Sequence, residues 1–315
     1  MNEFRYDALL VLTYGGPESP DDVPLYLERL FAGKSSSPRA RERGKERYAL
    51  IGGKSPIMGQ ARDFAAALYE EFDPLPVYLG CLYASPLLEE SLRVIADAGH
   101  RRVLVLITSP FGIEGVRLRY TERLESAAHA APKAEFFLAP PFYAHPKWVR
   151  AQADRVLSLL AEETLESIRW EREEVSGASV LLFTAHSLPL TAAGGYPDEL
   201  RKSCLSIAAA LAPRAIPWYQ VYQSRSGPAA TWLGPDAETL VRAIPARHPG
   251  ATGCLVVPVG FFFENLETIV DLDRDLAAAA AKENLTYRRA PAVSDAPEIL
   301  EMVREFLAER LPPVG

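Results

Sequence analysis

The sequence predicts an α/β protein with two similar halves, each a doubly wound parallel sheet covered by helices. Short apolar runs alternate with longer helical patterns, which is typical of parallel sheets with helical crossovers. This alternation stops at a charged segment, 162–177, and then starts again. At 315 residues the chain is also long for one hydrophobic core, so two domains are expected.

Four strands are expected in the first half, each an apolar run bounded by turn residues. The strands are 7–14, 76–83, 102–109 and 134–139, and the helical patterns between them are 21–31, 56–72, 87–98 and 116–130. A long helix then begins at Pro146, where the missing N–H of proline costs no hydrogen bond.

The same pattern returns after the charged segment. Strands are expected at 179–185, 217–222 and 253–259, and helices at 198–212, 236–245 and 265–282, followed by an amphipathic final helix at 297–311. We therefore expect two Rossmann-like domains, 1–150 and 151–315, with the final helix able to pack back on the first. Ligands of such sheets bind beyond the carboxyl ends of the strands, so we expect the two sheets to face an interdomain cleft.

Composition narrows the class of protein. A net charge of −7 without a basic run argues against nucleic acid as a partner. The three cysteines, Cys81, Cys204 and Cys254, lack C-x-x-C spacing, which disfavours a disulfide framework or a cysteine zinc site and fits a reducing compartment. No signal peptide or transmembrane segment is apparent, so a cytoplasmic location is expected, and peripheral membrane contact stays open.

His186 is the first candidate functional residue. It ends the apolar run that begins at Val180, and its unperturbed pKa near 6.5 would let it accept a proton near neutral pH. The alternative is a structural histidine whose nitrogens are simply hydrogen-bonded, and the residue alone does not decide between the two.

The helix expected at 265–282 carries a second candidate group. Glu267, Asp271 and Asp275 are four residues apart, so on an α-helix they climb one face in steps of about 6 Å that drift by about 40°. The alternative is a solvated face opposite the apolar stripe of the same helix. Asp273 falls inside that stripe, and we expect it to be buried and paired with a cation or with backbone donors.

One histidine with spaced carboxylates is too few ligands for a closed zinc site, and the sequence contains neither a His-Glu-x-x-His motif nor an Asp-x-Asp calcium loop. An incomplete ligand set suits a protein that holds a divalent ion briefly and then transfers it. These residues therefore favour metal transfer.

Two glycine loops follow expected strands or precede expected helices. The loop 14–22 contains Gly15, Gly16 and Pro17 but no G-x-G-x-x-G, so a pyrophosphate cradle is not expected. The loop 51–56 offers Lys54 and Ser55 to a carboxylate or phosphate; Ser55 as N-cap with Pro56 at N1 is an alternative that is compatible with this.

Taken together, the motifs resemble the ferrochelatase family, which inserts Fe2+ into a porphyrin during haem synthesis. The matching stretches follow the family's order along nearly the whole chain: Leu-Thr-Tyr-Gly-Gly-Pro at 12–17, Arg-Tyr-Ala-Leu-Ile-Gly-Gly-Lys-Ser-Pro at 47–56, Thr-Ala-His-Ser-Leu-Pro at 184–189, Tyr-Gln-Ser-Arg at 222–225, Trp-Leu-Gly-Pro at 232–235 and Val-Pro-Val-Gly-Phe…Asn-Leu-Glu-Thr at 257–268.

The resemblance implies roles for particular residues. His186 and Glu267 match the paired catalytic residues at the porphyrin centre, where a base must remove pyrrole protons. Asp271 and Asp275 match an acidic ladder along which metal is thought to travel, and Tyr14 matches a tyrosine that approaches the metal from the opposite face. The positions that match porphyrin-binding residues are Arg47, Tyr48, Ser55 and Tyr120.

Two departures affect the choice of porphyrin. Leu82, beside Tyr83, stands where the family has a basic residue, and Phe31 and Ala32 stand where monoderm-type enzymes can present arginines. Tyr14 and the short chain still look most like the enzymes that use coproporphyrin III, with protoporphyrin IX as the alternative. A cobalt or nickel tetrapyrrole chelatase and a non-enzymatic haem carrier are further alternatives.

The resemblance also implies the cofactors and partners. The expected partners are the porphyrin and ferrous iron, with contact to a membrane surface or another haem-pathway enzyme left open. No permanently bound cofactor is expected, and no iron–sulfur cluster, because the cysteine-bearing extension of some relatives has no counterpart here.

Overall fold

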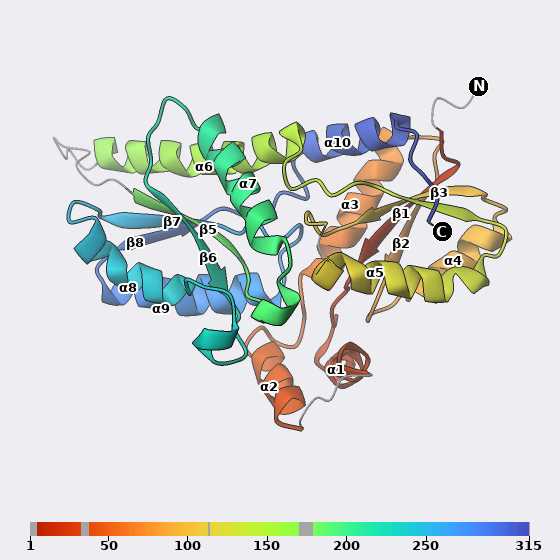
Figure 1. Ribbon diagram of the computed structural model, residues 1–315, viewed down its shortest axis with the longest axis horizontal. Coiled ribbons are helices and arrows are strands. Elements are labelled where there is room, and N and C mark those ends of the chain that lie inside the picture. Colours follow the sequence, from red (N-terminus) through yellow and green to blue (C-terminus); the bar gives the residue numbers. More distant parts are fainter. Residues whose placement is uncertain (1–4, 33–37, 113, 170–178, 315) are drawn as a thin grey trace. The chain divides into compact units, whose positions relative to one another are not determined.

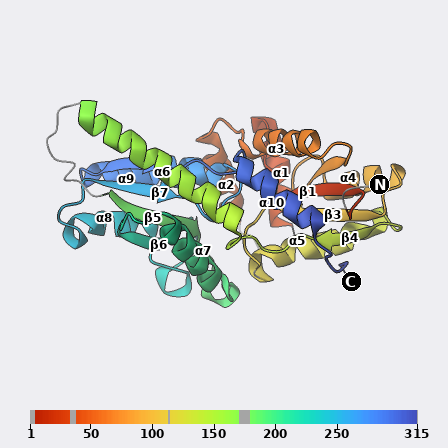
Figure 2. The same ribbon diagram turned by 90° about the horizontal axis from the view of Figure 1, so that it is seen from above.

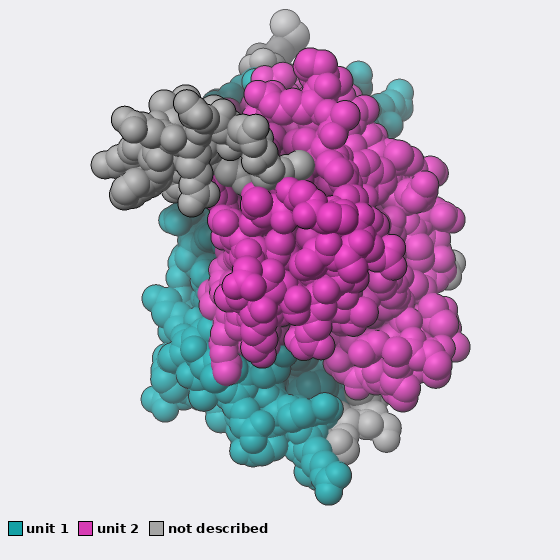
Figure 3. Space-filling view, turned by 90° about the vertical axis from the view of Figure 1, so that its left-hand side faces the viewer, with its two compact units in different colours: residues 1–141, 263–266, 300–315 teal, residues 142–262, 267–299 magenta. Residues whose placement is uncertain are grey.

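The computed structural model describes residues 5–32, 38–112, 114–169 and 179–314 (Figure 1). The chain divides into two compact units (Figure 3). Unit 1 comprises residues 1–141, 263–266 and 300–315, and unit 2 comprises residues 142–262 and 267–299. The charged segment 162–177 lies partly outside the described residues: helix α6 continues through it to Arg169.

The sheet of unit 1 has four parallel strands in the order β2-β1-β3-β4. They are β1 (Ala8–Thr13), β2 (Val77–Cys81), β3 (Arg102–Ile107) and β4 (Glu135–Leu138). The surrounding helices are η1 (Pro20–Asp22), α1 (Val23–Phe31), α2 (Pro38–Ala49), α3 (Ile57–Glu71), α4 (Leu88–Asp97), α5 (Glu114–Ala127) and η2 (Ala128–Ala130). Every residue of β1 is buried, because parallel strands in the middle of such a sheet are covered on both faces.

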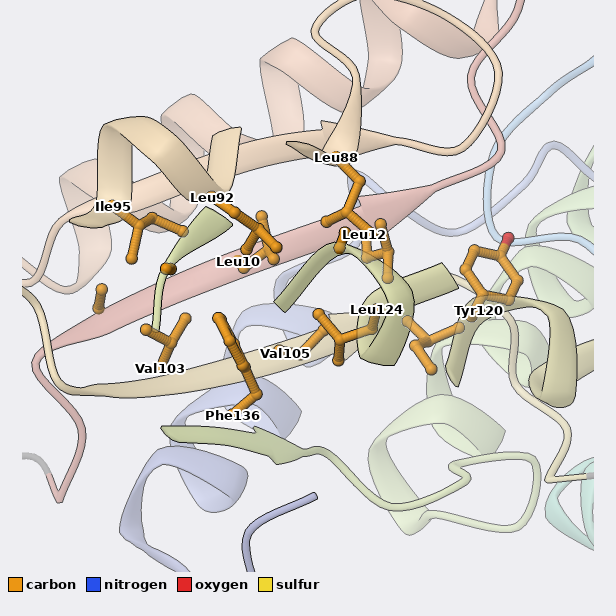
Figure 4. Close-up of a cluster of buried hydrophobic side chains, with 14 of the residues drawn as sticks. Leu10, Leu12, Leu88, Leu92, Ile95, Val103, Val105, Tyr120, Leu124 and Phe136 are labelled. Carbon is orange, nitrogen blue, oxygen red and sulfur yellow. The ribbon is translucent and has the colours of Figure 1, made fainter. Parts of the chain in front are cut away.

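One face of this sheet packs against α4 and α5. Alternate residues of β1 and β3, such as Leu10 and Val105, meet Leu92 of α4 and Leu124 of α5 in one apolar cluster (Figure 4). The C-terminal segment also belongs to unit 1: Arg304 of α10 (Pro297–Ala308) pairs with Glu71, and the Tyr6 hydroxyl donates to the carbonyl of Glu309 at 2.8 Å.

Unit 2 repeats the architecture, with the strand order β6-β5-β7-β8. Its strands are β5 (Ser179–His186), β6 (Trp218–Gln223), β7 (Gly253–Val257) and β8 (Thr286–Arg289). Its helices are α6 (Pro146–Arg169), η3 (Leu190–Ala192), α7 (Tyr196–Ala210), η4 (Ala229–Thr231), α8 (Ala237–Arg247), η5 (Thr268–Leu276) and α9 (Ala277–Lys282). Figure 2 shows α6 as one long helix. The fold class expected from the sequence, an α/β protein with two parallel sheets, is confirmed.

The helices of unit 2 cover different faces of its sheet. Val180 and Leu182 of β5 pack with residues of α8, η5 and α9 in one cluster. In Figure 1, α6 lies on one side of this sheet and α8 and α9 lie on the other. The face covered by η5 is the one that carries the candidate site.

The helix after β7 differs from the expected α-helix. Its first part, η5, is a π-helix, in which hydrogen bonds run from i to i+5, and it continues as the α-helix α9. A π turn holds more residues than the 3.6 of an α-helix, so the α-helical period used in the sequence analysis does not describe which residues of η5 share a face. Within the described residues no helix is long and apolar enough to cross a membrane.

Candidate active site

His186 is the last residue of β5, at the carboxyl end of the unit 2 sheet. The Nδ1 atom lies 2.5 Å from the carbonyl oxygen of Ser187. A carbonyl only accepts hydrogen bonds, so this contact assigns the proton of the neutral imidazole to Nδ1. The Nε2 atom is then the one that can accept a proton or bind a cation.

The side chain of His186 lies on the face of the sheet that η5 covers. Residues two apart in a strand share a face, so Thr184 and His186 follow Val180 and Leu182, which pack against η5. Gln223 of β6 is paired in register with His186 and shares this face with Val221. Three polar side chains near the strand ends therefore lie on the sheet face that η5 covers: Thr184, His186 and Gln223.

The acidic row starts at the N-terminal end of η5. Glu267 and Asp271 are half-buried, while Asp275 is exposed and lies 3.6 Å from its neighbour Arg274. Beside this row runs a buried one, Thr268, Leu272 and Leu276, which anchors the helix on the sheet. The row of carboxylates therefore begins with two half-buried residues and ends with an exposed one.

Ser224 fixes one of these carboxylates. Its hydroxyl donates to Oδ2 of Asp271, in a hydrogen bond between the end of β6 and the π-helix. Ser224 has φ of 61°, a left-handed conformation that is uncommon for residues with a side chain and often marks functional sites.

A tight turn holds the ends of β5 and β6. The Ser187 hydroxyl donates to the carbonyl of Leu233 at 2.9 Å, and the backbone N–H of Tyr222 donates to Pro235 at 2.9 Å. Asp236 then caps α8 by accepting from the backbone N–H of Thr239 at 3.1 Å. The Trp232–Asp236 segment is thus a turn into a helix, and it supports the strand ends.

The burial expected for Asp273 is wrong. Its side chain is 42% exposed, and it forms a two-pronged ion pair with Arg289 at 2.6 and 2.8 Å. The cation partner was expected, but the α-helical period placed the residue in the wrong row. Ile269 is half-buried and Asp273 is exposed, so this side of the helix turns away from the core. The Asp273 carboxylate is therefore not buried in apolar surroundings.

Across the described residues, no three His, Cys, Asp or Glu side chains come together as a group that could hold a metal. His186, Glu267 and Asp271 are nevertheless carried by adjacent elements of one unit.

Unit 1 contains the other candidate residues, and here the tyrosines are in contact. Tyr14, directly after β1, has its ring centroid 5.1 Å from that of Tyr120 and 5.3 Å from that of Tyr83. Tyr26 lies 6.4 Å from Tyr83 and 5.7 Å from Tyr48. These five residues form a continuous chain of rings, which we call the tyrosine chain, that joins Tyr14, Tyr48 and Tyr120.

Burial holds the pKa of the Tyr120 phenol well above its usual range, and the nearby Tyr14 raises this pKa as well. Tyr120 therefore stays neutral and takes part in the core seen in Figure 4. Leu82, where a basic residue was expected, is 1% exposed and belongs to the same core, so that position has no room for a solvated cation. Tyr83, its neighbour, occupies the space beside Tyr14.

The two glycine loops of unit 1 touch each other. The backbone N–H of Ser55 donates to the carbonyl of Pro17 at 2.8 Å, and a Cβ on Gly16 would lie 2.8 Å from the Cβ of Ser55. Ser55 is 2% exposed and does not cap α3, whose N-cap is Pro56, so the capping expectation is wrong. Arg47 lies half-buried at the last turn of α2.

The structure thus groups the sequence-derived residues into two sets, one in each unit. Sequence reasoning missed Gln223, Ser224, Tyr26 and the packing of Tyr83. A signal existed for the first two, because both lie in the Tyr-Gln-Ser-Arg motif that follows an expected strand.

Comparison with known proteins agrees with these motifs. The family model for ferrochelatase matches residues 6–311. A coproporphyrin III ferrochelatase of Frankia alni is 38% identical, with 96% of this chain and 79% of that protein covered. One of Streptomyces griseus is 35% identical (97% and 85% covered), and a ferrochelatase of Rhodopirellula baltica is 32% identical (97% and 86%).

Among solved structures, SirB from Bacillus subtilis with Fe3+ superimposes with a TM-score of 0.56 at 12% identity, over 96% of this chain and 95% of that one. At this identity the likeness concerns the fold alone. The match of the family model over nearly the whole sequence, together with relatives above 30% identity, shows that the chain belongs to the ferrochelatase family.

Proposed function

We propose that this protein inserts Fe2+ into coproporphyrin III, with His186 as the proton acceptor and Glu267 and Asp271 as the carboxylates that guide the cation. The observation that carries the proposal is the contact between Nδ1 of His186 and the carbonyl oxygen of Ser187, on the sheet face that also carries the acidic π-helix. This contact leaves Nε2 as the nitrogen that can accept a proton from the substrate.

The reaction requires this kind of group. A free porphyrin carries two pyrrole N–H protons, and both must leave as the metal enters. A neutral imidazole can accept such a proton near neutral pH, and general base catalysis of this type contributes about 10²–10⁴-fold. Glu267 and Asp271 supply negative charge and oxygen ligands to the incoming dication, and Asp275 extends that charge to the surface.

The porphyrin would contact unit 1 through the tyrosine chain and the touching glycine loops. Tyr14 is the residue we propose on the axial side of the metal. Tyr120 contacts Tyr14 directly, and Tyr48 lies at the other end of the chain of rings. Arg47 and Ser55 are proposed for the propionates. Aromatic rings suit a flat macrocycle because they offer large apolar faces with little conformational freedom to lose.

Coproporphyrin III is favoured over protoporphyrin IX because relatives at 31–38% identity carry the name coproporphyrin III ferrochelatase. Coproporphyrin has four propionates where protoporphyrin has two. We further propose that the protein acts in the cytoplasm and needs no bound cofactor, iron–sulfur clusters included.

An anaerobic insertion assay with Fe2+ and each porphyrin in turn tests the choice of substrate. We expect kcat/KM to be higher for coproporphyrin III than for protoporphyrin IX. The reverse preference would overturn the substrate assignment, and no insertion into either porphyrin would overturn the function.

A further inference from the structure

The edge strand β8 binds the π-helix at two consecutive residues. The hydroxyl of Tyr287 donates to the backbone carbonyl of Leu272 at 2.9 Å. The guanidinium of Arg289 donates to the carboxylate of the next residue, Asp273, at 2.6 and 2.8 Å. A further N–H of this guanidinium donates to the carbonyl of Ala290 at 3.0 Å, which holds it in place. Two side chains of one strand therefore fix two adjacent positions of η5.

Both side chains reach η5 from the sheet face that it covers. Residues two apart in a strand share a face, so Tyr287 and Arg289 project from the same side of β8. In the parallel register they pair with Cys254 and Val256 of β7, which belong to the apolar cluster that includes residues of η5. Tyr287 packs against the same cluster.

The contact made by Tyr287 lies where the π winding ends. The backbone N–H of Ala277, the first residue of α9, donates to the carbonyls of Arg274 and Leu272. The bond from Ala277 to Leu272 spans five residues, which is the π pattern. A carbonyl oxygen has two lone pairs, so the carbonyl of Leu272 can accept from Ala277 and from Tyr287 together.

A π-helix of this length needs support from outside the helix. In proteins π winding occurs mostly as single-turn bulges, whereas η5 comprises nine residues. In an α-helix the carbonyl of Leu272 would accept from Leu276 instead of Ala277. Each residue of an α-helix turns by about 100°, so converting a π turn to an α turn rotates one end of the helix against the other by about that angle.

Such a rotation would displace the acidic row. Beyond the junction, Leu276, Ala279 and Ala280 are buried in the core of unit 2, so that end of the helix is held. The end that carries Glu267 and Asp271 would then have to move. The winding at Leu272 thus determines where these two carboxylates lie.

We propose that Tyr287 and Arg289 of β8 are positioning residues that fix where the π winding of η5 ends, and so set the places of Glu267 and Asp271 for the incoming ferrous ion. The inference rests on the proposed function, in which these two carboxylates guide the cation. Tyr287 and Arg289 act through the helix and are not metal ligands. Burial raises the pKa of the Tyr287 phenol well above its usual range, so its hydroxyl remains a donor.

Matched variants separate this role from a general loss of stability. Tyr287→Phe removes the hydroxyl alone, and Arg289→Met removes the guanidinium but keeps a long apolar side chain. Two controls lie in unit 1. Tyr6→Phe loses a hydrogen bond from a tyrosine to a backbone carbonyl at 2.8 Å, and Arg304→Met loses an ion pair. The full-length variants are assayed for anaerobic insertion of Fe2+ into coproporphyrin III.

The kinetic constants should distinguish the two pairs of variants. Groups that orient metal-binding side chains commonly contribute 10–100-fold, so Tyr287→Phe and Arg289→Met should raise KM for Fe2+ about tenfold or more, with KM for the porphyrin changed less than about twofold. Tyr6→Phe and Arg304→Met should keep both wild-type KM values. Tyr287→Phe and Tyr6→Phe should lower Tm by a similar few degrees, because each loses one hydrogen bond.

A crystal structure of the double variant, Tyr287→Phe with Arg289→Met, tests the winding itself. We expect the carbonyl of Leu272 to accept from the N–H of Leu276, in the α pattern. Unchanged π winding in the double variant would overturn the proposal, and so would an unchanged KM for Fe2+. A wild-type protein that inserts no iron would overturn the proposed function, whereas the winding of the double variant would still decide whether β8 fixes η5, so the two failures are distinguishable.

Discussion

The hydroxyl of Ser224 donates a hydrogen bond to the carboxylate of Asp271, a residue 47 positions later in the chain. The bond ties the end of β6 to the π-helix and fixes the second carboxylate of the acidic row. Hydrogen bonds to charged groups contribute about 1.5–3 kcal/mol, so this contact is strong enough to set the position of Asp271.

Two substitutions of Ser224 separate its hydrogen bond from its backbone conformation. Ser224→Ala and Ser224→Gly both free Asp271, so both should raise KM for Fe2+ more than KM for the porphyrin. Glycine also relieves the left-handed φ of 61°, which should make Ser224→Gly about 1 kcal/mol more stable than Ser224→Ala. Steady-state kinetics and urea unfolding measure the two effects, and equal KM values for Fe2+ in the wild type and both variants would contradict the role assigned to Ser224.

The tyrosine chain should contribute to porphyrin affinity through ring packing rather than through hydroxyl groups. Tyr83 joins Tyr14 to Tyr26, and each aromatic pair is worth about 0.5–1.5 kcal/mol. Tyr83→Ala should therefore weaken coproporphyrin binding by about tenfold, while Tyr83→Phe, the matched control, should change it little. Quenching of porphyrin fluorescence gives the two dissociation constants, and an equal loss in both variants would show that the hydroxyl matters instead.

In the glycine loop before Ser55, an alanine should destabilise the fold more at Gly53 than at Gly52. Gly52 and Gly53 both have positive φ, of 68° and 76°, so alanine strains the backbone at either site. Only at Gly53 would the new Cβ collide, at 2.7 Å from the Cα of Pro20. Gly52→Ala should cost about 1–2 kcal/mol. Gly53→Ala should cost measurably more in chemical denaturation, and equal losses would refute the packing argument.

Stability should fall at alkaline pH because of the buried thiols. Burial raises the pKa of Cys81 and of Cys254 to about 12 from the ordinary value of 9.0. Above pH 9 the unfolded chain therefore releases thiol protons that the folded chain retains, and the free energy of unfolding decreases as pH rises from 9 towards 12.

Each such thiol contributes up to about 1.4 kcal/mol per pH unit in this range. Urea unfolding between pH 8 and 11 measures the slope. In Cys254→Ala the slope should be shallower than in the wild type, and an identical slope would show that Cys254 does not contribute.

The sequence predicted the strand ends well. His186 was expected at the end of an apolar run, and a buried parallel strand is easy to recognise because both its faces are covered. The order of strands and helices in the two halves follows from the same signal. The family resemblance then assigned chemistry that apolar patterning alone leaves open.

Other features depend on tertiary contacts that no local pattern records. The helix α2 has a single buried residue, Tyr48, so its charged sequence lacks the apolar stripe by which a helix is recognised. The short strand β8 has no fully buried residue. The segment η5 winds as a π-helix with Thr268 and Leu272 buried, and the α-helical period misplaced Asp273 because it does not apply to this winding.

The central claim is that Nε2 of His186 removes the pyrrole protons, and one comparison tests it most directly. His129 is a matched control: its Nδ1 also bonds a backbone carbonyl, that of Ser126 at 2.8 Å, but it is exposed on unit 1. In anaerobic insertion of Fe2+ into coproporphyrin III, His186→Ala should lower kcat by about 10²-fold or more while the porphyrin still binds, and His129→Ala should retain full activity. Near-normal turnover by His186→Ala would contradict the account.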